Sequence, residues 1–137
     1  MKTYKVIVDS EGTIRWYNQQ DQLSNEHGPA IECADGTKYW YLNGKLHRED
    51  GPAIEYANGT KSWYLNGKPH REDGPAVTYA NGDKSWYLNG KPHREDGPAI
   101  DWADGYKYWY LNGKQLTEQQ FLEQTNTCEG KVVEIDG

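Results

Sequence analysis

Three copies of the tetrapeptide His-Arg-Glu-Asp contain the side chains best suited to chemistry in this chain. They stand 23 residues apart, and their basic residues are His47, Arg48, His70, Arg71, His93 and Arg94. Repeated His-Arg pairs suit two kinds of site. Imidazoles bind metal ions, and guanidinium groups bind anionic small molecules or nucleotides.

The spacing argues against a shared metal ion. If each unit is a two-stranded hairpin, equivalent histidines lie two strand spacings apart, about 9–10 Å. Zinc ligands lie about 2 Å from the ion. We therefore expect a structural ladder in which each arginine pairs with acids of its own or the adjacent copy. A site for an anionic ligand is the alternative, and we expect no metal and no cofactor.

The tetrapeptides belong to a 23-residue unit that is written four times across residues 22–113. Its anchors are Gly-Pro-Ala and Trp-Tyr-Leu-Asn-Gly-Lys, the latter beginning at Trp40, Trp63, Trp86 and Trp109. This period is typical of stacked units that bury their apolar faces only against neighbours. We predict one domain over residues 1–137, with an N-terminal cap hairpin (1–21), four repeats, and a C-terminal cap with a short helix (114–137).

Each unit contains the pattern of a β-hairpin. In the second copy, β-prone residues flank Asn58-Gly59, a pair that favours a two-residue turn. Such a turn would place Ile54 opposite Trp63 and Glu55 opposite Ser62. The predicted fold is all-β, an elongated single-layer antiparallel sheet of tandem hairpins.

That register predicts a packed face and a variable face. The packed face would contain Ile54, Tyr56, Lys61, Trp63 and Leu65, which change little between copies. Burial then explains the row of tryptophans better than a stacking platform for bases or sugars does. The opposite face varies, and its tyrosines and acids suit protein recognition. The candidate partner-binding residues are Glu32, Tyr39, Tyr41, Asp101, Tyr106, Tyr108 and Tyr110.

The two ends depart from the repeat. Residues 4–8 and 13–17 resemble an opening hairpin, and Thr117 with Gln120 is a capping-box pattern for a helix to about residue 124. Residues 131–135 alternate weakly and suggest a last strand. Cys33 occupies a position that is aromatic in the other copies, so we expect a small core residue there.

Charge and hydropathy exclude several classes of function. The net charge is −6 and no basic stripe runs along the repeats, which argues against nucleic acid and anionic membrane surfaces as partners. No apolar run of membrane-spanning length and no secretory signal is present, so we expect a cytoplasmic protein. Its catalytic residue types occur as equivalent copies along a line, whereas an active site needs unlike residues at one point. We expect no enzymatic activity.

The order Trp63, Asn66-Gly67-Lys68, His70, Gly74 and Tyr79 resembles the MORN repeat in a variant form. The likeness covers about two thirds of the chain, and this chain inserts residues 71–73 between the histidine and the glycine. The resemblance implies a hairpin sheet that docks proteins, as in bacterial accessory, antitoxin-like and bacteriophage proteins. It makes an inhibitor, neutraliser or adaptor the expected function. The alternatives are sequestration of an anionic ligand and a structural spacer that forms homo-oligomers.

Overall fold

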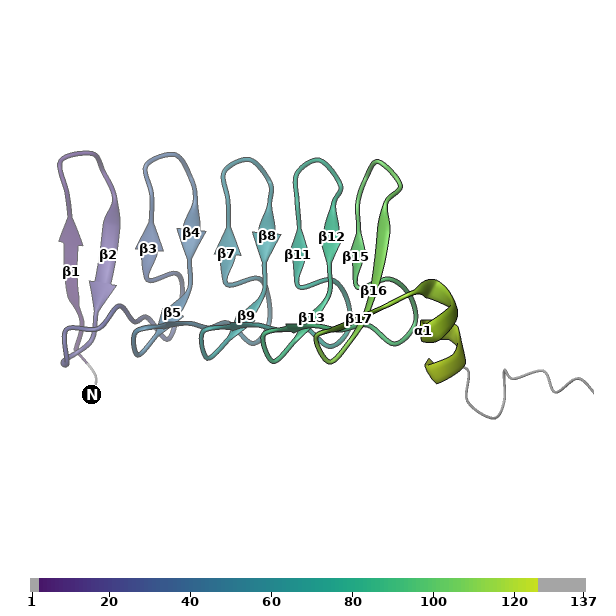
Figure 1. Ribbon diagram of the computed structural model, residues 1–137. Coiled ribbons are helices and arrows are strands. Elements are labelled where there is room, and N and C mark those ends of the chain that lie inside the picture. Colours follow the sequence, from purple (N-terminus) through teal and green to yellow (C-terminus); the bar gives the residue numbers. More distant parts are fainter. Residues whose placement is uncertain (1–2, 126–137) are drawn as a thin grey trace, which may run out of the picture.

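The computed structural model describes residues 3–125 and contains a long antiparallel sheet with one short C-terminal helix (Figure 1). Eleven strands form the sheet, in the order β1-β2-β3-β4-β7-β8-β11-β12-β15-β16-β17. Neighbours in space therefore follow one another in sequence, as tandem hairpins require. This confirms the predicted fold class. The strand suggested at residues 131–135 lies outside the described residues.

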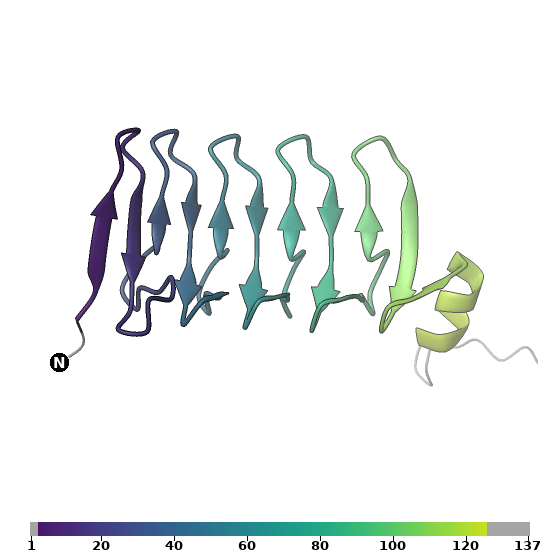
Figure 2. The same ribbon diagram turned by 60° about the vertical axis from the view of Figure 1, so that its left-hand side comes forward.

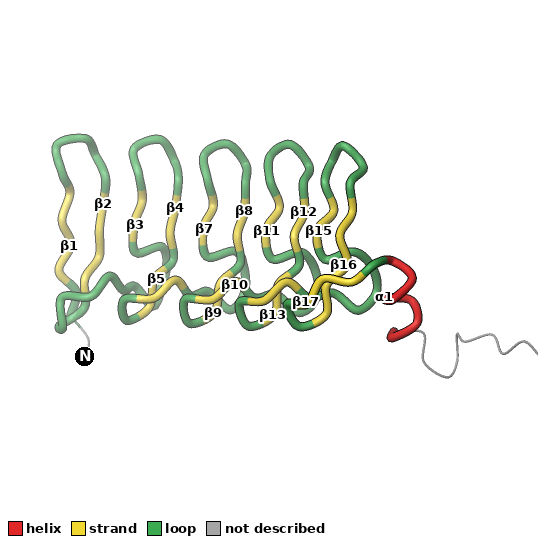
Figure 3. Tube along the Cα trace, viewed as in Figure 1, coloured by secondary structure: helices red, strands yellow, loops and turns green. Residues whose placement is uncertain are grey.

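The strands of the sheet are short. They are β1 (Lys5–Val8), β2 (Ile14–Tyr17), β3 (Ile31–Glu32), β4 (Lys38–Tyr39), β7 (Ile54–Glu55), β8 (Lys61–Ser62), β11 (Val77–Thr78), β12 (Lys84–Ser85), β15 (Ile100–Asp101), β16 (Lys107–Leu111) and β17 (Lys114–Leu116). Three further hairpins form a second row: β5 (Tyr41–Leu42) with β6 (Lys45–Leu46), β9 (Tyr64–Leu65) with β10 (Lys68–Pro69), and β13 (Tyr87–Leu88) with β14 (Lys91–Pro92). Figures 2 and 3 show this row turned away from the upright hairpins.

The first turn of each repeat has three residues, so the predicted two-residue turn is wrong. Tyr56 donates its N–H to the carbonyl of Thr60 at 2.9 Å, which leaves residues 57–59 in the loop. The side chain of Asn58 accepts the N–H of Thr60, and Gly59 has φ of 95°. A two-residue type I′ turn needs positive φ at both central residues, whereas here Asn58 folds back on the chain and Gly59 alone is left-handed.

This turn shifts the register by one residue. Ile54 pairs with Ser62, and Glu55 pairs with Lys61. Because directly paired residues project to the same side of a sheet, Ile54 lies with Ser62 and not with Trp63. The same register recurs in the other three copies. The predicted packed and variable faces are therefore wrong, because each groups residues that lie on opposite faces of the sheet.

The corrected register defines two faces. On the aromatic face, each copy places the residues equivalent to Ile54, Tyr56, Thr60, Ser62 and Tyr64. On the charged face, each places the equivalents of Glu55, Lys61 and Trp63. Ile54, Thr60 and Ser62 are buried, with exposed fractions of 5%, 9% and 6%. Thr37 and Ser85, which occupy the last two positions in other copies, are also buried, whereas Tyr106 and Tyr108 of the fourth copy are exposed.

Acids and lysines alternate across the charged face. Glu55 lies between Lys38 and Lys61, and Asp101 lies between Lys84 and Lys107. The Lys107 ammonium is 3.0 Å from Asp101. Opposite charges in cross-strand pairs stabilise a sheet modestly. Three of the four copies have an acid at this position, and the third has Thr78, which lies between Lys61 and Lys84.

The second turn of each repeat is the type I′ turn. Leu65 pairs with Lys68, and the intervening Asn66 and Gly67 have φ of 50° and 81°. Gly67 also donates its N–H to the carbonyl of Leu46 in the preceding hairpin, β5–β6, at 2.8 Å. The second row is therefore held together across copies by its turns.

The core is thin and built from small residues. Ala30, Ala53, Ala76 and Ala99 are completely buried, whereas no large side chain among residues 3–125 is. Each of these alanines follows the Gly-Pro pair, and its carbonyl accepts the N–H of a tryptophan in the preceding hairpin, as Ala76 does from Trp63 at 2.6 Å. Single-layer hairpins leave little room for a thick aliphatic core.

The two ends depart from the repeat as predicted. Helix α1 (Glu118–Thr125) begins with a reciprocal capping box: Gln120 donates its N–H to the Thr117 hydroxyl at 3.1 Å, and Thr117 donates its N–H to the Gln120 side chain at 2.9 Å. The helix contacts β16 and β17, and Phe121 is 3% exposed. At the other end, β1 and β2 form the predicted opening hairpin.

Candidate partner-binding surfaces

The arginine of each His-Arg-Glu-Asp segment lies over a tryptophan ring of the charged face. The guanidinium carbon of Arg71 is 4.0 Å from the ring centroid of Trp63. Its Nη1 donates to the carbonyl of Pro75 at 3.2 Å, and its Nε donates to Asp73 at 3.0 Å. Arg48 and Arg94 make the equivalent contacts. The tryptophans are thus covered by cations of their own chain.

The carboxylates of these segments are held by the same arginines. In the fourth copy, the Arg94 guanidinium keeps the pKa of Asp96 below its usual value, since the hydrogen bond at 2.8 Å favours the charged carboxylate. In the second copy, Arg48 also reaches Glu55 at 3.1 Å. This is the intra-copy pairing that the structural-ladder hypothesis predicts.

A side chain in place of the glycine beside each stacked arginine would displace the guanidinium group. A Cβ atom placed on Gly74 would lie 2.9 Å from the guanidinium carbon of Arg71, closer than real Cβ contacts. Gly51 and Gly97 have the same restriction. The Gly-Pro-Ala anchor and the His-Arg-Glu-Asp segment are therefore two parts of one packing unit.

The histidines form a second ladder. Nδ1 of His70, which follows the β9–β10 hairpin, accepts the N–H of Asn89 in the turn of the β13–β14 hairpin at 2.9 Å. His47 and His93 do the same for Asn66 and Asn112. With Nδ1 as acceptor, the proton of the neutral ring is assigned to Nε2. Nε2 of His93 lies 3.2 Å from Glu95. Both ring nitrogens thus have structural partners.

The first copy shows that these bonds, and not the residue types, are what the fold requires. Ser24 and Asn25 stand where the other copies have His and Arg. The Ser24 hydroxyl accepts the N–H of Asn43 at 3.1 Å, and the Asn25 amide donates to the carbonyl of Pro29 at 3.1 Å. The backbone partners are those that histidine and arginine have elsewhere.

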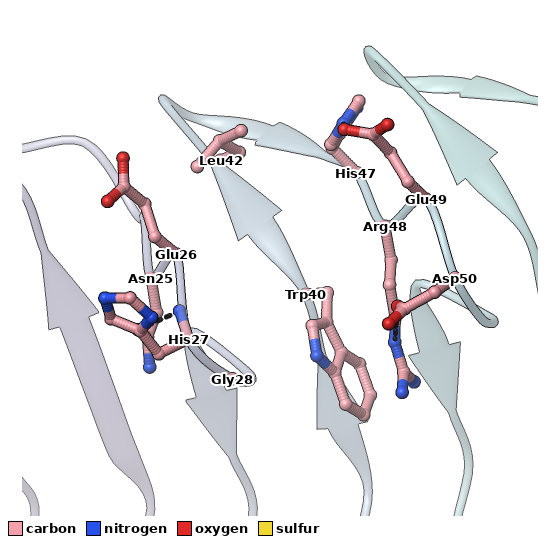
Figure 4. Close-up of a pocket in the computed structure, with 10 residues that line it drawn as sticks. All are labelled: Asn25, Glu26, His27, Gly28, Trp40, Leu42, His47, Arg48, Glu49 and Asp50. Atoms are coloured by element: carbon pink, nitrogen blue, oxygen red, sulfur yellow. Dashed lines mark hydrogen bonds and ion pairs between the residues drawn. The ribbon is translucent and has the colours of Figure 1, made fainter.

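Open grooves lie between successive loops on this side of the molecule. One of about 480 Å³ is lined by Trp40, His47, Arg48 and the two acids that follow, with residues 25–28 as its other wall (Figure 4). Its equivalents at Trp63 and Trp86 have volumes of about 410 and 530 Å³. The acids on the rims, Glu49, Asp50, Glu72, Asp73, Glu95 and Asp96, have side chains 78–90% exposed.

This arrangement favours the ladder over both ligand hypotheses. The guanidinium Nε and Nη1 groups that would hold an anion already donate to carboxylates and carbonyls, and the exposed charges around the grooves are negative. Residues 3–125 contain no group of three or more His, Cys, Asp or Glu side chains arranged to hold a metal ion.

The structure separates the predicted partner-binding residues. Tyr39 and Tyr41, with Tyr106, Tyr108 and Tyr110, lie on the aromatic face. Glu32 and Asp101 pair with lysines on the charged face. The tyrosines and acids therefore do not form one surface, because the register differs by one residue from the predicted one.

The aromatic face also contains exposed rings that are not among the predicted partner-binding residues. Tyr56, Tyr79 and Trp102 are 38%, 43% and 41% exposed, and they adjoin Tyr106 and Tyr108, which are 66% and 38% exposed. The first copy has Cys33 at this position. The cysteine is half-buried and is not among the buried core residues, in contrast to the predicted small core residue. The residue types at this position, Cys, Tyr, Tyr and Trp, suit a packed row as well as an exposed one, so the sequence alone did not mark the row as exposed.

Half-buried tyrosines, Tyr64 and Tyr87 among them, lie beside the row of exposed rings. Burial raises the pKa of Tyr64 and Tyr87 above the usual value, with neighbouring tyrosines as smaller causes. Among these neighbours are Tyr56 and Tyr79, so the half-buried tyrosines lie close to the exposed row. Tyr39 also meets Tyr56 edge to face, with ring centroids 6.4 Å apart. The rings support one another and present a broad surface.

Comparison with protein-family models, curated proteins and solved structures gives no match for this chain. No helix among residues 3–125 has the length and apolar character needed to cross a membrane.

Proposed function

We propose that this chain is a non-enzymatic, MORN-like repeat module that binds another protein through its aromatic face and acts as an inhibitor or adaptor. The observation that carries the proposal is the row of partly exposed rings formed by Tyr56, Tyr79, Trp102, Tyr106 and Tyr108. Tyrosine and tryptophan are enriched at the energetic centres of protein interfaces. They supply large contact areas with few rotatable bonds.

The extent of the face favours a protein over a small ligand. Equivalent positions in successive hairpins lie about 9–10 Å apart, so three steps from the first to the fourth copy span roughly 30 Å. A drug-sized molecule would use a concave pocket. Three grooves lie at the arginine-covered tryptophans, on the charged face, and two further pockets lie beside Tyr4 of the N-terminal hairpin. None of these pockets is lined by the exposed rings of the aromatic face.

The proposal is tested by site-specific photo-crosslinking in the native host. A photoreactive phenylalanine analogue replaces Tyr79 on the aromatic face or, as the matched control, Lys84 on the charged face of the same hairpin. We expect a discrete cross-linked protein from position 79 alone. Excess wild-type chain should abolish this cross-link by competing for the partner, whereas excess Tyr79→Ala/Trp102→Ala variant should leave the cross-link unchanged. Equal adducts from both positions would reject the aromatic face as the binding surface.

A further inference from the structure

The two ends of the sheet are finished differently. At the C-terminal end, α1 packs against β16 and β17. At the N-terminal end, β1 has β2 as its only neighbour within the described sheet, and all four of its residues are exposed. Val6, Ile7 and Val8 are 45%, 43% and 62% exposed. An uncovered, apolar edge strand is a template for pairing with another strand.

The direction of the free backbone groups on β1 follows from its pairing with β2. Asp9 donates its N–H to the carbonyl of Thr13 at 3.0 Å, so its backbone faces β2. Backbone direction alternates along a strand. Ile7 and Lys5 therefore also bond toward β2, and the N–H and C=O groups of Val6 and Val8 point away from the sheet.

The geometry points to a second copy of this chain as the occupant of the edge, with the two β1 strands antiparallel about a twofold axis at Ile7. In this register Val6 of one copy faces Val8 of the other, and their outward groups form four backbone hydrogen bonds. Ile7 meets its own equivalent. The inference does not depend on the partner proposed for the aromatic face.

Charge complementarity supports this register. Lys5 of one copy falls opposite Asp9 of the other, on both sides of the axis. Within each chain, Lys5 lies 2.8 Å from Asp21, and Asp9 lies 2.9 Å from Arg15. Basic and acidic groups therefore alternate across the contact, and like charges are not brought together. An antiparallel pairing of identical strands is isologous and closes at two copies.

The dimer should be weak, because a four-residue edge is smaller than a standard interface. Sedimentation of the full chain between about 10 μM and about 1 mM covers the expected affinity range. The weight-average mass should rise with concentration from 15.7 kDa toward twice that value. A constant monomer mass over the whole range overturns the inference.

Two charge variants test the register itself. Val6→Lys/Val8→Lys and Val6→Glu/Val8→Glu should each be monomeric, since like charges would then face each other across the axis. An equimolar mixture should associate again, because every Lys then faces a Glu. Both substituted positions are exposed, and unchanged circular dichroism and melting temperature will show that the fold is intact.

The remaining outcomes are equally decisive. Association of either charge variant alone at wild-type strength places the contact elsewhere and overturns the inference. Failure of the mixture to associate overturns the register. Leu122→Lys is the matched control, because Leu122 is an exposed apolar residue of α1 at the opposite end, with 53% exposure. Loss of association in that variant would place the contact at the C-terminal cap.

Discussion

Replacing Gly74 by alanine should destabilise the protein by displacing Arg71, whereas Gly28→Ala in the first copy should not. At Gly74 the new Cβ would lie 2.9 Å from the guanidinium carbon and 3.1 Å from Nη1. At Gly28 the nearest atom is the Asn25 amide nitrogen, at 3.7 Å, an ordinary contact. The two substitutions are chemically identical and occupy equivalent positions.

The magnitude follows from what Arg71 loses. Leaving the Trp63 ring forfeits a cation–π contact of about 0.5–2 kcal/mol. Leaving the Pro75 carbonyl forfeits a charged hydrogen bond of about 1.5–3 kcal/mol. The ion pair with Asp73 adds little, since that carboxylate is 83% exposed. Alanine recovers about 0.4–1 kcal/mol by restricting the unfolded chain, so the net loss should be about 1–4 kcal/mol if Arg71 leaves both contacts.

Urea unfolding of both glycine variants measures this difference, with Gly28→Ala expected to be neutral or slightly stabilising. A double-mutant cycle identifies the cause. In an Arg71→Ala background, Gly74→Ala should no longer destabilise, because the clashing group is absent. A full loss of stability in that background, or an equal loss for Gly28→Ala, would refute the packing explanation.

Three further outcomes are expected. His70→Ala should accelerate hydrogen exchange of the Asn89 amide, whereas His70→Ser should preserve protection, as serine does at the equivalent position of the first copy. Thr60→Val should destabilise by about 1–2 kcal/mol in urea, since the Ala80 N–H loses its 3.1 Å acceptor. Asp9→Asn should flatten the acid limb of the stability profile. A salt-bridging guanidinium and two backbone N–H groups lower the pKa of Asp9, so its contribution is present above the unfolded pKa and is lost as pH falls through the folded value.

The repeat period was enough to predict the fold, because the turn pairs, the Gly-Pro anchor and the β-prone runs recur at fixed offsets. The capping box was equally local, with Thr117 and Gln120 three residues apart. The register could not be predicted from Asn58-Gly59 alone, because that pair fits both a two-residue turn and a three-residue loop. The choice depends on which backbone group the Asn58 side chain bonds. A register shift of one residue moves every side chain of the shifted strand to the opposite face of the sheet.

Variation between copies proved to be a poor measure of exposure, and the bonds explain why. Thr37 and Thr60 each accept the N–H of an alanine in the next copy, and Asp83 does the same for Ala103 at 2.7 Å. Tyr106 is the fourth member of this series, and no fifth hairpin equivalent to β15–β16 follows it in the described sheet, where β17 is the last strand. In the first three copies this position thus tolerates any side chain that accepts the alanine N–H of the following hairpin. In the fourth copy the described sheet offers no such N–H to accept, so the residue type is not restricted in this way. The exposed ring of Tyr106 is therefore the residue of this series that is free to serve recognition.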